Sequence, residues 1–355
     1  MSAAVEEQEP LRWQELLRPR NFFAWSPLSF ISRFTVVVII VLIAVSSNWS
    51  AAAANDPPTA TPLFVLEQIE DSITVAESQI TDIRPGLEKS IIWADAPHHR
   101  TEYAIVYIHG FSASKEELRP VPDRIASTLG ANIFYTRLTG HGRTAKAMYD
   151  ASVAAWMQDL AEAYQIGSVI GNKVILISCS TGGTLVAAGM VSGMFSKQLF
   201  STVFFAPNFG LQDQMAQLLT WPLARYWAPL IGGEMQNNAP RNQLHARYWT
   251  TSYPTISLIP MMQLIDMVDD AELSKSTVPA LFYFSPDDKV VDPQKTENFI
   301  TRWRGPKEIV RINGKDSEDE LNHLITGRVV SPSQVERAAD TVINWHNSIS
   351  QAVAN

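Results

Sequence analysis

The residues best suited to chemistry in this 355-residue chain surround Ser180. Residues 174–177 are four branched apolar residues, which is typical of a strand buried on both faces. Residues 184–188 then have the composition of a helix start, so Ser180 would stand at a sharp strand-to-helix turn, a nucleophile elbow. Such a turn strains the serine backbone, and the small neighbours Ser178 and Gly182 would prevent a clash. The alternative is an ordinary helix cap at Ser180.

A serine hydroxyl is a poor nucleophile at neutral pH, so it needs a base, and the base needs an orienting acid. In a strand–turn–helix architecture the order along the chain is serine, acid and histidine, beyond the carboxyl ends of strands. His323 is predicted to be the base because it follows the last predicted strand. His346 lies within the predicted C-terminal helix and is interpreted as structural.

Three aspartates after the strand predicted at 278–284 compete for the role of the acid. Asp292 precedes a proline, which indicates a helix N-cap. Asp288 is favoured because it stands at the loop tip before an apolar pair, and Asp287 stays open as the alternative. The acidic run 316–320 is interpreted as a solvated loop.

A second landmark is the His109-Gly110 pair, directly after a strand predicted at 103–108. Gly110 would let the backbone turn so that the amide of Phe111 points at a substrate oxygen. Together with the amide of Thr181, this amide would form an oxyanion hole, a pair of donors for the developing negative charge. The His109 side chain is interpreted as a brace for its own loop.

Two other residues of reactive type are given plain roles. His141 lies in a predicted loop without a Cys, an Asp or a second His at ligand spacing, so no metal site is predicted. Cys179 is the single cysteine, which excludes an intrachain disulfide, and it is interpreted as a small buried apolar residue. The chemistry predicted at Ser180 requires no cofactor.

The elements that must position these residues alternate along the chain. Strands are predicted at 89–93, 103–108, 132–137, 174–177, 202–207, 278–284 and 308–312, and helices at 122–129, around 156–164, from 184 and from 331. This alternation predicts the α/β class, with a doubly wound, mostly parallel sheet. Residues 114–117 have the pattern of a capping box, which is typical of a helix N-terminus.

Five motifs follow predicted strands in order. They are His109-Gly110-Phe111, Leu138-Thr139-Gly140-His141-Gly142, Ser178-Cys179-Ser180-Thr181-Gly182, Ser285-Pro286-Asp287-Asp288-Lys289-Val290-Val291 and Asn322-His323. Together they resemble the α/β-hydrolase superfamily, and within it the lysophospholipase, monoacylglycerol lipase and carboxylesterase group, over about residue 89 to the C-terminus. Ser178 and Ser285 stand where that group commonly has Gly, a small-for-small change that leaves the triad intact but favours no single subfamily.

Residues 208–277 are not needed by the parallel sheet, which would be built from residues 89–207 and 278–355. The resemblance implies that this insertion is a helical lid over the active site. Its Leu, Met, Trp and Tyr residues recur at spacings of three and four, which indicates amphipathic helices. Most are expected to pack on the core, and we hypothesise that some line an apolar pocket for acyl chains.

Residues 34–54 carry no charge and are just long enough to cross a bilayer as a helix. Four arginines precede this segment and no Lys or Arg follows until Arg84, so the positive-inside rule predicts a cytoplasmic leader at 1–33 and an exported remainder. The segment is predicted to be a transmembrane signal anchor, or a signal peptide if it is cleaved near 52–54. Residues 55–88 would be linker and lead-in.

The formal net charge of −8 argues against nucleic acid as a partner. The sequence therefore predicts a membrane-anchored serine hydrolase of carboxylic esters, with lipid-like or acyl substrates and an extracytoplasmic catalytic domain, periplasmic in a bacterium and secreted if the signal is cleaved. A thioesterase, an amidase or an acyltransferase would use the same residues. An inactive binding module with this fold is the alternative outside enzymes.

Overall fold

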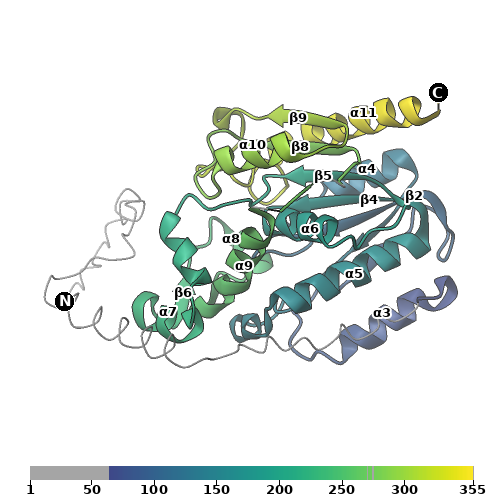
Figure 1. The fold of residues 1–355 in the computed structure, drawn as a ribbon. Helices are drawn as coiled ribbons and strands as arrows, with labels where there is room; N and C mark the ends of the chain where they lie inside the picture. Colours follow the sequence, from purple (N-terminus) through teal and green to yellow (C-terminus); the bar gives the residue numbers. More distant parts are fainter. Residues whose placement is uncertain (1–63, 270, 274–275, 355) are drawn as a thin grey trace, which may run out of the picture. The chain divides into compact units, whose positions relative to one another are not determined.

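The centre of the fold is a seven-stranded sheet that is parallel except at one edge (Figure 1). The computed structural model describes residues 64–269, 271–273 and 276–354. In spatial order, the strands are β1 (Ser90–Ile92), β3 (Asn132–Tyr135), β2 (Thr101–Ile108), β4 (Gly171–Cys179), β5 (Leu199–Phe205), β8 (Ala280–Phe284) and β9 (Lys307–Arg311). Only β1 runs antiparallel to its neighbour in this sheet, so the predicted, mostly parallel α/β sheet is confirmed.

Strand β4 lies in the middle of the sheet and is buried on both faces. Val174 and Leu176 belong to the apolar core on one face, and Ile175 and Ile177 belong to the core on the other. Because successive side chains of a strand point to opposite faces, a strand covered on both sides needs a continuous apolar run. This is why the sequence before Ser180 shows no polar alternation.

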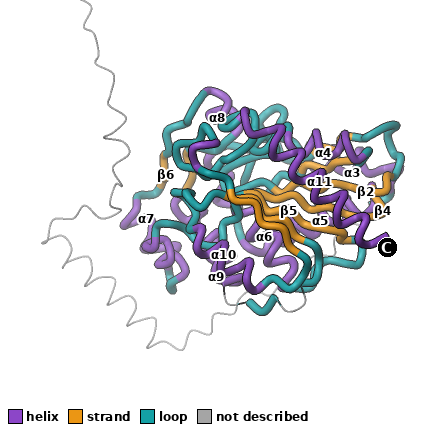
Figure 2. The backbone as a smooth tube through the Cα atoms, turned by 90° about the horizontal axis from the view of Figure 1, so that it is seen from above, coloured by secondary structure: helices purple, strands orange, loops and turns teal. Residues whose placement is uncertain are grey.

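Helices cover both faces of the sheet. One face carries α4 (Val121–Leu129) and α11 (Val335–Ala354), and the other carries α3 (Ile69–Ser78), α5 (Val153–Ile170), α6 (Thr181–Val191) and α10 (Pro293–Arg302). Seen from above, α4 and α11 lie toward one side of the strands, and α6, α9 and α10 toward the other (Figure 2). Short 3₁₀ helices are η1 (Leu66–Gln68), η2 (Ala145–Asp150), η5 (Gly314–Asp316) and η6 (Pro332–Gln334).

Residues 208–277, which we call the cap, follow β5. In the described residues, the cap elements are η3 (Gln214–Thr220), α7 (Ala224–Gly232), β6 (Met235–Asn237), α8 (Gln243–Tyr248), β7 (Ser252–Pro254), η4 (Thr255–Ser257) and α9 (Leu258–Asp269). Strands β6 and β7 form a two-stranded antiparallel sheet, with α8 between them in the chain. Helix α9 shares the apolar core of α5 and α6, because Met261, Leu264 and Val268 are buried there.

The prediction of a capping box at residues 114–117 is wrong. These residues form turns, and α4 begins only at Val121 and ends at Gly130 in a left-handed conformation. Ser114 Oγ accepts a hydrogen bond from the Glu116 amide, but no helix follows there. The Glu117 side chain instead turns inward and is buried beneath the loop after β2.

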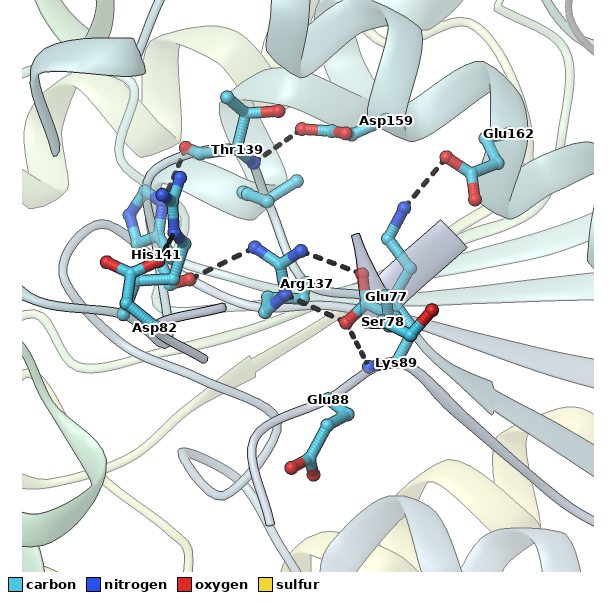
Figure 3. Close-up of polar contacts among 12 residues, drawn as sticks. Glu77, Ser78, Asp82, Glu88, Lys89, Arg137, Thr139, His141, Asp159 and Glu162 are labelled. Carbon is cyan, nitrogen blue, oxygen red and sulfur yellow. Dashed lines mark hydrogen bonds and ion pairs between the residues drawn. The ribbon is translucent and has the colours of Figure 1, made fainter. Parts of the chain in front are cut away.

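Helix α3 is attached to the core by a buried ion pair. Glu77 of α3 accepts two hydrogen bonds from the Arg137 guanidinium, at 2.7 and 2.9 Å (Figure 3). One Glu77 oxygen also accepts the Lys89 amide at 2.9 Å. Arg137 lies just before the predicted loop Leu138–Gly142, so α3 is linked to a loop on the edge of the sheet where the site lies.

Within the described part of the chain, no helix combines the length and the apolar composition that a bilayer crossing requires. The segment predicted at 34–54, the leader 1–33 and the cleavage position at 52–54 all lie outside the described residues. Of the predicted linker and lead-in at 55–88, the described part begins at residue 64 and contains η1 and α3.

Candidate active site

Ser180 stands at the turn between β4 and α6. Its backbone has φ +49°, a conformation that residues other than glycine rarely adopt. A Cβ atom at Gly182 would lie 2.3 Å from the carbonyl oxygen of Ile108, so only glycine lets α6 approach β2 this closely. Ser180 occupies the N-cap position of α6, but its side chain makes no capping hydrogen bond. The geometry is therefore that of the elbow, not of an ordinary helix cap.

The Ser180 hydroxyl is hydrogen-bonded to a histidine and, through it, to a carboxylate. Ser180 Oγ lies 3.0 Å from His323 Nε2, and His323 Nδ1 lies 2.7 Å from Asp288 Oδ2. All three side chains are buried. Since the Asp288 carboxylate can only accept from Nδ1–H, Nε2 is left to accept from the serine hydroxyl. The structure thus brings together the three residues that the sequence predicted as nucleophile, base and acid.

The three competing aspartates lie in different surroundings. Asp288 also accepts hydrogen bonds at Oδ1 from the amides of Val290 (2.8 Å) and Val291 (3.0 Å), which fixes its orientation. Asp287 instead accepts the Gly314 amide at 3.0 Å. Asp292 caps α10 by accepting the amide two residues ahead at 2.8 Å, as predicted. Among the three, Asp288 is the one that contacts His323.

The charge around His323 favours its protonated form. Burial alone would lower the pKa of His323, but the carboxylates of Asp288, Asp319 and Glu117 outweigh it and raise this pKa above the usual 6.5. A histidine with a raised pKa is a stronger base, which suits a group that must take a proton from a hydroxyl.

The segments that carry the two amides proposed for an oxyanion hole both adjoin Ser180. Thr181 is the first residue of α6, where an amide has no carbonyl of its own helix to bind. A Cβ atom at Gly110 would lie 3.0 Å from the Ser180 Cβ atom, so the Gly110 backbone packs directly against the serine. Phe111 follows Gly110 in this loop.

Glu117 supports the loop from below, and sequence reasoning did not find it. Its Oε2 accepts the Gly110 amide at 2.7 Å and the Tyr107 hydroxyl at 2.9 Å. Burial raises the pKa of Glu117. A carboxyl group in this position holds the backbone that carries Phe111. The one available signal was an acidic residue soon after His109-Gly110, and it was interpreted as part of a helix cap.

The other histidines and the cysteine have supporting positions. His109 is buried, and its pKa falls to about 4 because burial disfavours the charged ring. Its Nε2 accepts the Leu138 amide at 3.1 Å, so Nδ1–H donates to the Gly110 carbonyl at 2.9 Å. His141 packs 5.0 Å from the His109 ring, and His346 packs 4.6 Å from Tyr103. Cys179 is buried. In the described residues, no three potential metal ligands come together.

Residues 99–315 match the family model Hydrolase_4, described as serine aminopeptidase, S33. The chain belongs to this S33 family of α/β-hydrolases. A search of curated protein sequences found no match for it.

Solved structures share the fold of this S33-family protein at low sequence identity. One of two metagenome-derived lipolytic enzymes, LipS and LipT, superposes with a TM-score of 0.59 at 16% identity, covering 75% of this chain and 99% of its own. A monoglyceride lipase from Saccharomyces cerevisiae, a soluble variant with a substrate analogue, gives 0.56 at 14%, covering 73% and 90%. A monoacylglycerol lipase from Paleococcus ferrophilus gives 0.54 at 13%, covering 73% and 97%.

Two cavities lie along the cap of this S33-family protein. One, of about 450 Å³, is lined by Leu219, Trp221, Tyr226 and Pro260 among others. The second, of about 390 Å³, is lined by residues of η3, α9 and α10, and Thr220 and Trp221 line both cavities. Ser180 and His323 line neither of them. The apolar acyl pocket that the sequence suggested stays a prediction.

Proposed function

We propose that this S33-family chain is a serine hydrolase that cleaves carboxylic esters through an acyl-enzyme on Ser180. The observation that carries the proposal is the continuous hydrogen-bonded series Ser180–His323–Asp288, with distances of 3.0 and 2.7 Å. Such a series meets the requirement that a hydroxyl nucleophile has an adjacent base and that the base has an orienting group.

In the proposed reaction, Ser180 Oγ attacks the ester carbonyl carbon while His323 Nε2 takes the hydroxyl proton. Asp288 keeps the imidazole in the tautomer with the proton on Nδ1 and stabilises the imidazolium. His323 then returns the proton to the leaving alcohol, and a water molecule cleaves the acyl-enzyme by the same route in reverse. The amides of Phe111 and Thr181 would bind the oxyanion, and each such donor lowers the barrier by about 3 kcal/mol. No cofactor enters these steps.

For the substrate, we propose lipid-like or other acyl esters. The support is the apolar composition of the cap, with its Met and aromatic residues, because flexible and aromatic side chains suit acyl chains. A series of p-nitrophenyl esters from acetate to palmitate tests this proposal. A strict preference for acetate would contradict it.

Amide hydrolysis is the second candidate, because the matched family is described as serine aminopeptidase. The same three residues could remove the N-terminal residue of a peptide if the site also bound the free α-amino group of that substrate. Aminoacyl β-naphthylamides, assayed beside the esters, separate the two activities. Turnover of the amides at rates comparable to the esters would favour the aminopeptidase. Thioester substrates and alcohol acceptors, added to the same panel, test the thioesterase and acyltransferase alternatives.

We also propose that residues 34–54 anchor the chain in a membrane, with the catalytic domain on the extracytoplasmic side. The support is the uncharged apolar segment with four arginines before it and none directly after it. Fusions of a reporter that is active only outside the cytoplasm, placed at the C-terminus, test this orientation. The size of the mature chain tells whether the segment is cleaved.

A fluorophosphonate probe tests the proposed nucleophile in the full-length protein. Labelling of the wild type and its loss in Ser180→Ala are expected. A folded wild type that does not react would instead favour an inactive binding module.

The matched pair Asp288→Asn and Asp287→Asn tests the acid. The first change is expected to lower kcat by about 10,000-fold, as for other serine hydrolases that lose the tautomer-fixing carboxylate, and the second by less than about threefold. His323→Ala should also abolish turnover without unfolding the protein. If Asp287→Asn is the damaging change, the acid is misassigned.

A further inference from the structure

Asp319 is a buried carboxylate that organises the backbone around His323. Oδ2 accepts the amides of His323 (3.0 Å) and Leu324 (2.7 Å), and Oδ1 accepts the amide of Leu321 (3.1 Å). The residue is only 3% exposed, although the acidic run 316–320 was interpreted as a solvated loop. That interpretation is wrong for Asp319. Three amides on one carboxylate fix the turn that carries the imidazole.

This turn contains a residue in the left-handed conformation. Asn322, directly before His323, has φ +56°, which is uncommon for a residue other than glycine. A conformation of this kind persists only where surrounding contacts hold it. The Asp319 hydrogen bonds hold the chain on both sides of Asn322.

The counter-charge of Asp319 comes from the cap. Arg241 Nη1 pairs with Asp319 Oδ1, and the Arg241 side chain is itself partly exposed. The next residue, Asn242, donates from Nδ2 to the Val329 carbonyl at 2.7 Å. This part of the cap therefore contacts residues 319–329, the loop that carries His323, at two places. Burial alone would raise the pKa of Asp319, but Arg241 and the backbone amides lower it below its usual value. Asp319 is therefore ionised at neutral pH.

We propose that Arg241 and Asp319 form a positioning pair through which the cap holds His323 in its reactive orientation. The inference rests on the proposed function, because it assigns His323 as the base. Its consequence is that the site is competent only while residues 241 and 242 are seated against the loop 319–329. The cap then acts on the proton-transfer step and not only on substrate access.

The pair also contributes to the electrostatic potential at His323. The ionisable groups that act on this imidazole are Asp288 after β8, Glu117 beneath the loop that follows β2, and Asp319 on the same loop as His323. Each raises the pKa of His323, and Arg241 partly neutralises the contribution of Asp319. His245 of α8 stands near the pair and is neutral, since burial and the Arg241 charge lower its pKa to about 4.

Because of these charges, the two variants Asp319→Asn and Arg241→Gln are expected to shift the pKa of His323 in opposite directions. Removing the Asp319 charge should lower the pKa of His323, and removing the Arg241 charge should raise it. Because the base works in its neutral form, activity rises with pH through this pKa. The acid limb of the kcat/KM profile is therefore expected to move to lower pH in Asp319→Asn and to higher pH in Arg241→Gln. A merely structural role would not produce opposite shifts.

The test uses the full-length protein in detergent with a soluble short-chain p-nitrophenyl ester. In Arg241→Gln and in Asp319→Asn we expect kcat to fall by about 10- to 100-fold while KM changes by less than about threefold, as for a slight misplacement of a catalytic group. The double variant should lose no more than Asp319→Asn alone. The control is Arg337→Gln with Asp316→Asn, an exposed ion pair beside the same loop, which should leave kcat unchanged.

Arg241→Lys keeps the positive charge at position 241. Its acid limb is expected to lie at the wild-type pH and not at the higher pH expected for Arg241→Gln. This variant keeps the test decisive if Asp319→Asn does not fold. The proposal would be overturned if the control pair lost as much kcat as Arg241→Gln and Asp319→Asn. It would also be overturned if the acid limbs of these two variants, when folded, did not move apart. If the wild type fails to react with a fluorophosphonate, the proposed function has failed instead. The His323 titration, followed by NMR in the same variants, then still reports whether the pair acts on the imidazole.

Discussion

The cap contains two apolar regions whose large side chains differ in burial. The outer cap, residues 214–232 in η3 and α7, leaves Met215, Trp221, Tyr226 and Leu230 exposed. The inner cap, residues 241–269 in α8, β7, η4 and α9, buries Trp249, Met262 and Leu264. Figure 1 shows α7 away from the sheet, with α8 and α9 between them. Hydrophobic content alone therefore does not tell which part of an insertion belongs to the core.

The difference lies in polar contacts with the loops of the site. In the inner cap, the Thr250 amide donates at 2.7 Å to the carbonyl of Ser112, the residue after Phe111. Arg84, from the segment after α3, donates to the carbonyls of Arg247 (2.9 Å) and Trp249 (3.0 Å). With Arg241 on Asp319, these contacts connect the inner cap to both sides of the site. The inner cap is thus part of the support of the site.

A matched pair of leucines tests this division most strongly. Leu264→Ala in the inner cap should lower the free energy of unfolding by about 2–5 kcal/mol, because it leaves a cavity in the core that α5 and α6 share. Leu230→Ala in the outer cap, where the side chain is 74% exposed, should change it by less than about 0.5 kcal/mol. Urea denaturation measures both values. Similar losses at the two positions would contradict the division.

His245 provides a test through pH. Its pKa is about 4 in the folded inner cap, because burial and Arg241 disfavour the charged ring, and about 6.5 in the unfolded chain. The unfolded state therefore binds more protons between these values, so stability should fall as the pH decreases from 6.5 to 4. The loss from this residue is about 3 kcal/mol at most.

The variant His245→Phe isolates that contribution. It keeps an aromatic ring against Trp249, whose ring centre lies 4.7 Å away, and it does not titrate. Denaturation curves at several pH values should show a flatter dependence than the wild type below pH 6.5. An unchanged slope would mean that His245 is not held neutral in the folded protein.

The smallest effect is expected from the outer cap. Trp221 lines both cap cavities and is 59% exposed, so Trp221→Ala should leave the free energy of unfolding almost unchanged. If the outer cap contacts acyl chains, the variant should lose about fivefold in kcat/KM for long-chain esters and little for acetate, from about 1 kcal/mol of lost apolar contact. Equal changes for both esters would remove the outer cap from substrate binding.

Much of the fold and the elbow could be predicted because their signals are local. The apolar run of β4 and the small residues around Ser180 describe a buried strand and a tight turn without reference to the rest of the chain. His323 followed from the order of strands. Asp288 was favoured over Asp287 from its place at the loop tip, but Asp287 stayed open because a sequence does not show which of two adjacent carboxylates contacts His323.

The supporting carboxylates were missed for a different physical reason. Asp319 and Glu117 lie in acidic stretches that have the composition of surface segments. Their burial is compensated by partners distant in the chain or by backbone amides, Arg241 for one and the Gly110 amide for the other. A sequence does not show which acidic residue of a charged run will find such partners.

The ion pair between Glu77 and Arg137 has a practical consequence for truncation. A shortened version that starts after α3, for instance to remove the apolar N-terminal segment for crystallisation, would leave the guanidinium buried without its counter-charge, at a cost of about 3–5 kcal/mol. Expression boundaries placed before Leu66 keep η1 and α3 and avoid this loss.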